Sequence, residues 1–262
     1  MTSTTEQDPL VRRFLKAVVP RRVRAWFWHR AWGTSDLSLR HKEVADRVGQ
    51  LVPRTGWLLD VGGRTLGLSP LLSGHVSPRV VVVNLDRSLL TRPGPSEMCV
   101  VADGTRLPFR SDTFGVSTCI DVLEHVPAPL RPALLYEMKR VTTSAVILHI
   151  PNAGTSRLFD RILYALSRDE HIRALTLDHL VIGTPRVGEI ASVLPGCRVR
   201  RRRNAWLWLL LVLAYQAPRL RHLVAGLLYA SLGWLDRCPP FYATMVEWCP
   251  SGAPGIRGHL DR

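Results

Sequence analysis

Short apolar runs rich in Val, Ile and Leu alternate with helix-compatible stretches through the middle of the chain, from Trp57 to Asn152. Runs of this kind favour β-strands. Their alternation with helical stretches is typical of βαβ units in a largely parallel sheet. We therefore predict strands within the runs WLLDV, RVVVVNLD, MCVVAD, FGVSTCID and SAVILHIP.

The C-terminal part of the chain has a different pattern. Residues 153–195 have the character of helices separated by polar breaks, and the later runs CRVRRRR and FYATMVEW are expected to form strands. Two uncharged apolar stretches, Asn204–Pro218 and Leu223–Leu235, lie between these strands. We expect them to form short helices that either cap the domain or lie in a membrane interface.

The two apolar stretches do not form a transmembrane hairpin. Each is shorter than the roughly 18–20 residues needed to span a bilayer. A hairpin would also place Arg219, Arg221 and His222, which lie in the turn between them, near the middle of the membrane, at a cost of several kcal/mol.

The first apolar stretch is apolar on every side of a helix between Ala205 and Ala214, so we expect it to bury its whole circumference. A lid that forms an apolar channel for a substrate would satisfy this requirement, and a homodimer interface is the alternative. Three tryptophans would lie at the solvent-exposed edge of the lid: Trp206, Trp208 and Trp234.

The N-terminal segment 10–32 is basic and contains no acidic residue. Leu10, Phe14 and Val18 recur with helical spacing before Pro20 interrupts the pattern, and several tryptophans follow. One interpretation is a basic amphipathic segment on an anionic membrane surface. The other is a helix that packs its apolar side on the domain and leaves its arginines in solvent.

Composition and charge narrow the classes of partner. The 262 residues include 46% hydrophobic residues, enough to build a core, and the net charge of +14 favours anionic partners such as nucleic acid, an acidic membrane surface or a phosphorylated substrate. The five cysteines form no CxxC pair, which argues against a structural zinc or a disulfide framework. With no signal-peptide pattern, we expect a cytoplasmic protein, with peripheral contact at the inner face of the membrane as a further possibility.

Acidic residues at the strand ends carry the strongest chemical signal. Ligands of parallel α/β sheets bind beyond the carboxyl ends of the strands, and four predicted strands end in Asp60, Asp86, Asp103 and Asp121. Glycines after the first strand allow the backbone to approach a ligand closely, and an acid about twenty residues further on is placed to hold two ribose hydroxyls. The glycines are Gly62, Gly63 and Gly67.

The stretch VVADGTRLPFRSDTFGVSTCIDVLEHV resembles the class I, Rossmann-like methyltransferases that use S-adenosyl-L-methionine. The resemblance extends from about Leu58 to Asn152 and implies a seven-stranded, mostly parallel sheet with helices on both faces. It also implies that Asp103 meets the adenine amino group and Asp86 the ribose. Bacterial proteins similar to the remaining chain carry an apolar helical insertion before the last strand. The implied cofactor-binding residues are Asp60, Gly62, Gly63, Gly67, Asp86, Asp103, Gly104 and Asp121.

The glycine loop departs from the family pattern D-x-G-x-G-x-G. Arg64 replaces the second glycine, and the last glycine is displaced by one position, to Gly67. Arg64 has three interpretations: it binds the methionine carboxylate of the cofactor, it points to solvent from a lengthened loop, or it blocks the pocket of a non-catalytic relative. The intact acids at the other strand ends disfavour the third.

The run DVLEHV raises the question of a metal. Some quinone-biosynthesis O-methyltransferases resemble this stretch and bind a divalent metal with an acid, a Glu and a His, which here would be Asp121, Glu124 and His125. The favourable position of Glu124 at a helix N-terminus and ordinary packing of His125 explain the residues without a metal, so we expect none. The sequence assigns no catalytic residue, although four histidines are candidates: His125 as a general base, and His149, His171 and His179.

These observations predict four parts of the chain. They are a basic amphipathic segment (1–45), a Rossmann-like cofactor-binding core (46–203), an apolar helical insertion (204–237), and the last strand with a C-terminal tail (238–262). The predicted function is methyl transfer to a small or membrane-associated acceptor: a glycan, a lipid or a lipid-linked intermediate. A nucleic-acid methyltransferase, supported by the arginines at 198–203, and a non-catalytic cofactor-binding protein are the alternatives.

Overall fold

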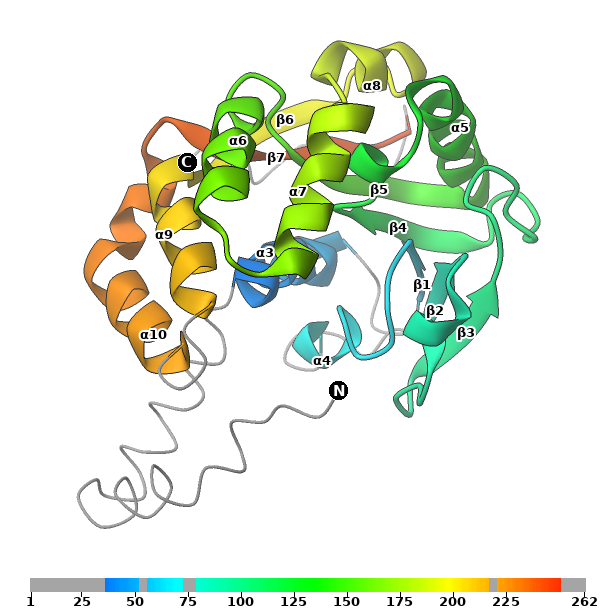
Figure 1. The fold of residues 1–262 in the computed structure, drawn as a ribbon. Helices are drawn as coiled ribbons and strands as arrows, with labels where there is room; N and C mark the ends of the chain where they lie inside the picture. The colour runs from blue at the N-terminus through cyan, green and yellow to red at the C-terminus, as the bar shows by residue number, and fades with distance from the viewer. Residues whose placement is uncertain (1–35, 52–55, 73–78, 217–220, 251–262) are drawn as a thin grey trace.

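A computed structural model describes residues 36–51, 56–72, 79–216 and 221–250. The N-terminal segment 10–32 and residues 217–220, which include half of the turn between the two apolar stretches, therefore lie outside the described residues. Within them, a seven-stranded sheet is flanked by helices (Figure 1). Its strands are β1 (Trp57–Val61), β2 (Arg79–Asn84), β3 (Glu97–Val101), β4 (Phe114–Ile120), β5 (Thr142–Pro151), β6 (Arg198–Asn204) and β7 (Phe241–Trp248).

The strand order is β3-β2-β1-β4-β5-β7-β6. Strands β1 to β5 pair in parallel, whereas β7 runs antiparallel to both of its neighbours. The predicted α/β class and mostly parallel sheet are thus confirmed. The order reverses at β1, so the loops after β1 and β4 diverge there and leave a crevice in which ligands of such sheets bind.

Helices connect the strands and cover both faces of the sheet. The α-helices are α3 (Asp36–Leu51), α4 (Ser69–Leu72), α5 (Arg131–Val141), α6 (Ser156–Leu166), α7 (Glu170–Ile182), α8 (Val187–Val193), α9 (Ala205–Tyr215) and α10 (Arg221–Leu232). Short 3₁₀ helices are η2 (Arg87–Leu90), η3 (Leu123–His125), η4 (Ala128–Leu130) and η5 (Gly233–Arg237).

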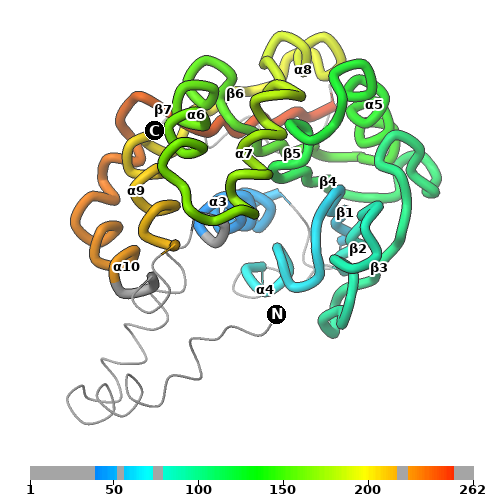
Figure 2. Tube along the Cα trace, viewed as in Figure 1, coloured from blue at the N-terminus to red at the C-terminus, as the bar shows by residue number. Residues whose placement is uncertain are grey.

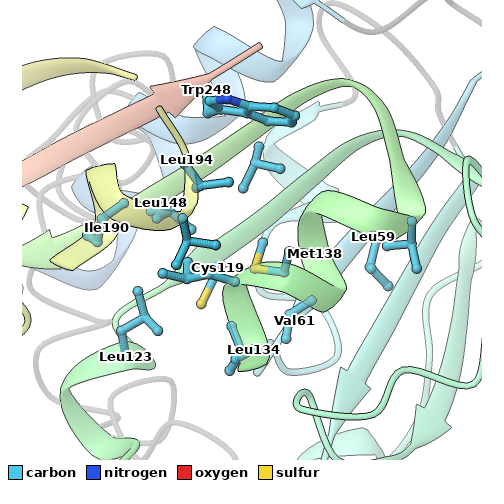
Figure 3. Packing of buried hydrophobic residues seen from close by; sticks show 14 of the residues in the cluster. Leu59, Val61, Cys119, Leu123, Leu134, Met138, Leu148, Ile190, Leu194 and Trp248 are labelled. Atoms are coloured by element: carbon cyan, nitrogen blue, oxygen red, sulfur yellow. The ribbon is translucent and has the colours of Figure 1, made fainter. Parts of the chain in front are cut away.

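Two buried layers hold these elements together. On one face, α5 and α8 pack against β1, β4 and β5, and Figure 3 shows how closely their side chains meet around Cys119 and Met138. On the other face, α3 and α4 pack against the same strands through Val44, Val48 and Leu72. Because successive strand residues point to opposite faces, strands covered on both sides are continuously apolar, which explains runs such as the one that forms β2.

Helix α3 extends across the boundary predicted at residue 45. It contacts α4 and α9 (Figure 2) and is part of the core rather than of a separate N-terminal segment. Arg47 of α3 donates from Nε to Oε2 of Glu247 on β7 at 2.7 Å, and both side chains are buried. This ion pair attaches the helix to a strand at the other end of the described chain.

The apolar stretch forms α9, α10 and η5 between β6 and β7. One side of α9 packs against α6 and β7 through Trp208 and Leu209, and another packs against α10 through Leu207 and Leu211. Within this chain α9 does not bury its whole circumference: Trp206 remains 54% exposed, although its ring lies against that of Phe159 on α6. Full burial of the helix would therefore require lipid or a partner. Trp208 is buried and does not lie at the solvent-exposed edge predicted for the lid.

Candidate functional site

The glycine turn after β1 requires glycine at two positions. Gly62 has a positive φ of 74°, and its amide donates to the carbonyl of Val83 at 2.7 Å. A Cβ at Gly62 would lie 2.3 Å from Cγ2 of Val122, and one at Gly63 would lie 2.1 Å from Oδ2 of Asp60. The turn therefore presents bare backbone at the carboxyl end of β1.

Side chains from β1, β2 and β4 hold this turn in place through hydrogen bonds. Oγ1 of Thr118 donates to Oδ1 of the buried Asp60 at 2.8 Å. Burial raises the pKa of the Asp60 carboxyl to about 7, an increase that the Thr118 hydrogen bond partly offsets. Nδ2 of Asn84 donates to the carbonyls of Gly62 and Gly63 at 2.9 and 2.7 Å. The loop is thus held from two neighbouring strands.

The remainder of the loop answers the question that Arg64 raises. Leu66 takes the left-handed conformation, with φ of 57°, at the position where the family pattern has its third glycine. Its amide donates to Oε1 of the buried Glu97 at 2.9 Å, and the same carboxylate accepts from Ser69 Oγ and the Gly94 amide. These bonds stabilise a conformation that costs a non-glycine residue roughly 1–2 kcal/mol. Arg64 itself is exposed at the cavity mouth, so it does not fill the interior.

A cavity of about 320 Å³ opens beside this turn. Of the eight residues expected to bind the cofactor, Asp60, Gly62, Gly63 and Asp121 line it. Polar residues from α3 and the strand ends form one side. The opposite wall is apolar and comes from α6, α7, α9 and β7: Leu163, Ile172, Leu175, Trp208, Val212 and Tyr242.

The remaining expected cofactor residues lie outside the cavity. Asp86 lies two residues beyond β2, is exposed, and accepts from the Ser88 amide at 2.8 Å as the N-cap of η2. Asp103 is likewise exposed and accepts from the Thr105 amide at 2.8 Å. These hydrogen bonds lower the pKa of both carboxyls. Gly104 packs closely on Leu134, and Gly67 follows the turn.

Asp121, at the end of β4, is held by two basic side chains. It has a positive φ of 53°. Nη1 of Arg40 donates to its Oδ2, and Nδ1 of His149 lies 2.9 Å from its Oδ1. Burial favours the neutral carboxyl, but the nearby charges of Arg40 and His149 outweigh it and hold the pKa of Asp121 well below its usual range. Asp121 is therefore an ionised, fixed group at the cavity wall.

Glu124 has the opposite environment. Its side chain is fully buried, and neither carboxylate oxygen has a hydrogen-bond partner among the described residues. Burial, and then the negative charge of Asp121, raise the pKa of Glu124 well above its usual range. The adjacent His125 and the α7 residue His179 also line the cavity, and their ring centroids lie 5.0 Å apart.

A buried carboxylate and two aromatic rings complete the far wall. Tyr242 donates from its hydroxyl to Oδ1 of Asp160 at 2.7 Å, and Nδ1 of His179 lies 3.4 Å from Oδ2 of Asp160. Trp208 stacks on Tyr242 with ring centroids 3.5 Å apart and an interplanar angle of 10°. The wall combines polar groups with an aromatic surface that suits an acceptor with an apolar part.

Sequence reasoning missed Arg40, Asp160 and Tyr242. Arg40 precedes the first strand, in a segment interpreted as separate from the core, and Asp160 lies in a helix with no motif. The YATMVEW run identified β7 but not the inward position of Tyr242. Of the candidate histidines, His125 and His179 line the cavity, His149 positions Asp121 behind it, and His171 is exposed elsewhere on α7.

Comparison with known proteins identifies the domain that contains the glycine turn. Residues 59–150 match the model of the methyltransferase domain. No curated protein matches the chain in sequence. Together with the sheet, this match shows that the chain contains a class I methyltransferase domain, which uses S-adenosyl-L-methionine.

Several solved structures share the fold. A protein described as a methyltransferase of an antibiotic biosynthesis pathway of Anabaena variabilis has a TM-score of 0.53 and 14% identity over 80% of this chain and 99% of its own. Haemonchus contortus phosphoethanolamine N-methyltransferase 2, in complex with phosphomonomethylethanolamine and S-adenosylhomocysteine, has a TM-score of 0.52 and 11% identity. That match covers 79% of this chain and 52% of that one. At such identities the likeness establishes the fold alone.

Proposed function

We propose that this methyltransferase modifies a small or membrane-associated acceptor: a glycan, a lipid or a lipid-linked intermediate, with an apolar part. The observation that carries the proposal is the apolar wall of the cavity. Trp208, Tyr242 and Val212 face a space that also reaches the glycine turn and Asp121. One end thus suits an apolar acceptor, and the other suits the polar cofactor.

Four of the proposed cofactor-binding residues line this cavity, and the other four are proposed from the resemblance to the family. Bare backbone at Gly62 and Gly63, where a Cβ would collide with its neighbours, fits close approach of a ligand. When bound, S-adenosyl-L-methionine supplies a methyl group that its sulfonium already activates. We assign contacts with it to Asp60, Gly62, Gly63, Gly67, Asp86, Asp103, Gly104 and Asp121.

The chain's own residues need to align the acceptor and exclude water. Arg40 and His149 fix Asp121 at the cavity wall, while α6, α7 and α9 cover the cavity on its apolar side. No side chain is assigned as catalytic, because alignment of the reacting groups is the main requirement of methyl transfer.

Peripheral contact with an anionic membrane at its inner, cytoplasmic face is part of the proposal. None of the helices in the described ranges has the length and apolar character to cross a bilayer. Large apolar side chains are nevertheless exposed on α9, α10 and η5, among them Trp206, Leu227 and Trp234. Together with the +14 net charge, they would suit an acidic, partly apolar surface.

Nucleic acid is the less favoured partner. The nucleic-acid hypothesis rests on the arginines at 198–203, which lie in β6 at the edge of the sheet. Arg202 lies 3.4 Å from Glu43 and Arg203 lies 2.9 Å from Asp236, so two of these arginines make ion pairs within the chain. Arg198 and Arg201 remain exposed, and they do not line the cavity.

Incubation with methyl-labelled cofactor tests the acceptor class. Lipid, aqueous small-molecule and RNA fractions are offered separately, and mass spectrometry follows the label. We expect incorporation into the lipid fraction. Label in RNA alone would replace the proposal with the nucleic-acid alternative, and binding of S-adenosylhomocysteine without any transfer would indicate a non-catalytic protein.

A pair of variants on α9 tests the apolar wall. Val212 lines the cavity, whereas Leu210 on the same helix is exposed. Val212→Gln should lower methylation of a lipid acceptor at least tenfold and leave S-adenosylhomocysteine affinity intact, and Leu210→Gln should change neither. If both variants keep activity but convert a dimer to a monomer in light scattering, the helix is an interface rather than a lid.

A further inference from the structure

Three potential metal ligands converge at one corner of the cavity. Glu124 and His125 are adjacent on η3, and His179 comes from α7, outside the segment that matches the family model. One ligand atom from each, an oxygen of Glu124 and a ring nitrogen of each histidine, lies within 4.8 Å of the others. All three residues line the cavity.

The environment of Glu124 gives a second, independent reason to expect a cation. Both of its carboxylate oxygens are buried and have no hydrogen-bond partner among the described residues. A buried carboxylate without a partner is costly unless it takes up a proton or binds a cation. The neighbouring basic groups Arg40 and His149 are engaged with Asp121, and the third nearby acid, Asp160, adds negative charge.

We propose that Glu124, His125 and His179 bind one divalent transition-metal ion. Two imidazoles and one carboxylate are a ligand set of Zn²⁺, Mn²⁺ or Fe²⁺, whereas Mg²⁺ and Ca²⁺ prefer sites made of oxygen atoms. Around a tetrahedral ion with bonds of ~2.1 Å, ligand atoms lie about 3.4 Å apart, so each pair of ligand atoms needs to approach by at most about 1.4 Å. The proposal departs from the sequence-based expectation that no metal binds. It also differs from the ligand set of the similar quinone-biosynthesis enzymes, because His179 replaces Asp121.

Nearby carboxylates support the two histidines. Nδ1 of His179 lies 3.4 Å from Oδ2 of the buried Asp160, and Nδ1 of His125 lies 4.0 Å from Oδ2 of Asp178. Such carboxylates commonly orient the imidazoles of a metal site and leave the other ring nitrogen for the ion. Asp160 is in turn fixed by the hydroxyl of Tyr242.

An ion at this corner would face the cavity and bind an oxygen of the acceptor there. This role rests on the proposed function, but metal binding itself does not. Metal binding would favour acceptors that carry a hydroxyl or phosphate oxygen next to their apolar part, because a divalent cation binds such oxygens.

Titration of the metal alone tests the site. The full chain is stripped with a chelator and titrated with Zn²⁺, Mn²⁺ and Mg²⁺ in separate calorimetric experiments, without cofactor or acceptor. We expect one Zn²⁺ or Mn²⁺ per chain with micromolar or tighter affinity, and Mg²⁺ binding at least tenfold weaker. Absence of stoichiometric binding of any of these ions would overturn the proposal.

Variants on one helix supply the control. His179→Asn should weaken binding at least tenfold, whereas His171→Asn, at an exposed position of α7, should not change it. Unchanged affinity of both variants for S-adenosylhomocysteine shows that each remains folded, and it separates failure of the metal site from failure of the cofactor site. Equal metal affinity of the two variants would also overturn the proposal.

Glu124→Gln distinguishes a cation from a proton. Gln is close in shape to a protonated Glu, so a protein whose Glu124 simply carries a proton should be as stable with Gln as without it. Under the metal proposal, Glu124→Gln loses the rise in melting temperature that Zn²⁺ or Mn²⁺ gives the unmodified chain. If the metal produces the same rise in both proteins, Glu124 is not a ligand.

Discussion

Nδ1 of His149 lies 2.9 Å from Oδ1 of Asp121, and this contact joins β5 to the residue that directly follows β4. Asp121→Asn removes the negative charge that His149 and Arg40 both contact, while Asn tolerates the positive φ at this position. Because the partners are largely buried, we expect the free energy of unfolding to fall by about 1–3 kcal/mol, measured by urea denaturation.

The control for this variant is an exposed ion pair on α3. Nζ of Lys42 lies 3.1 Å from Oδ2 of Asp46, and both side chains are well exposed. Asp46→Asn should change the free energy of unfolding by less than about 0.5 kcal/mol. Similar effects of Asp46→Asn and Asp121→Asn would mean that the Asp121 contacts contribute nothing special to stability.

Gly63→Ala should abolish cofactor binding. The new Cβ would lie 2.1 Å from Oδ2 of Asp60, a distance that forces the glycine turn to move. A Cβ added at Gly188 on α8 would instead point into open space, with no neighbouring atom within 4 Å, so Gly188→Ala should leave affinity unchanged and slightly increase stability. Calorimetry with S-adenosylhomocysteine measures both affinities, and unaltered binding by Gly63→Ala would place the cofactor elsewhere.

Asp86→Ala should lower the affinity for S-adenosylhomocysteine by roughly 5- to 150-fold, because the ribose would lose a hydrogen-bond acceptor. The variant also removes the cap of η2. Asp169 is a matched control, since it caps α7 in the same way by accepting from the Ile172 amide. Asp169→Ala should lose a similar amount of stability but keep its cofactor affinity. Equal affinities of the two variants would remove Asp86 from the cofactor site.

The buried carboxyl of Asp60 predicts a pH dependence of stability. Its pKa is about 7 in the folded chain and near 3.8 in the unfolded chain, so between these values the folded state binds more protons than the unfolded state. This group therefore stabilises the fold most at acid pH, and its contribution is lost as pH rises through 7. Relative to the unmodified chain, Asp60→Asn should gain stability from pH 4 to pH 8 in urea titrations. A constant difference across this range would contradict the raised pKa.

The sequence was sufficient to predict the fold because the strands are buried on both faces. Their apolar runs and the acids after them located β1, β2, β4 and β5 to within a few residues of the observed bounds. The family pattern then fixed the position of the glycine turn. Local signals of this kind do not depend on which elements meet across the molecule.

The other half of the cavity depends on packing between distant elements and could not be predicted in this way. Asp160 and Tyr242 meet across 82 residues, and neither belongs to a recognisable motif. Leu66 shows a further limit: it keeps a left-handed conformation without glycine because Glu97, far along the chain, binds its amide. A pattern based on glycine alone would indicate a damaged loop, whereas its hydrogen bonds show an intact turn.

The buried ion pair between Arg47 and Glu247 has a consequence for synthesis of the protein. The two residues are 200 positions apart, so at about 5–20 residues per second a ribosome makes Glu247 roughly 10–40 s after Arg47. During that interval α3, which also supplies Arg40 to the cavity, lacks its ion-pair partner on β7. The nascent chain therefore acquires a complete pocket only after β7 has left the ribosome, and α3 lacks its buried partner until then.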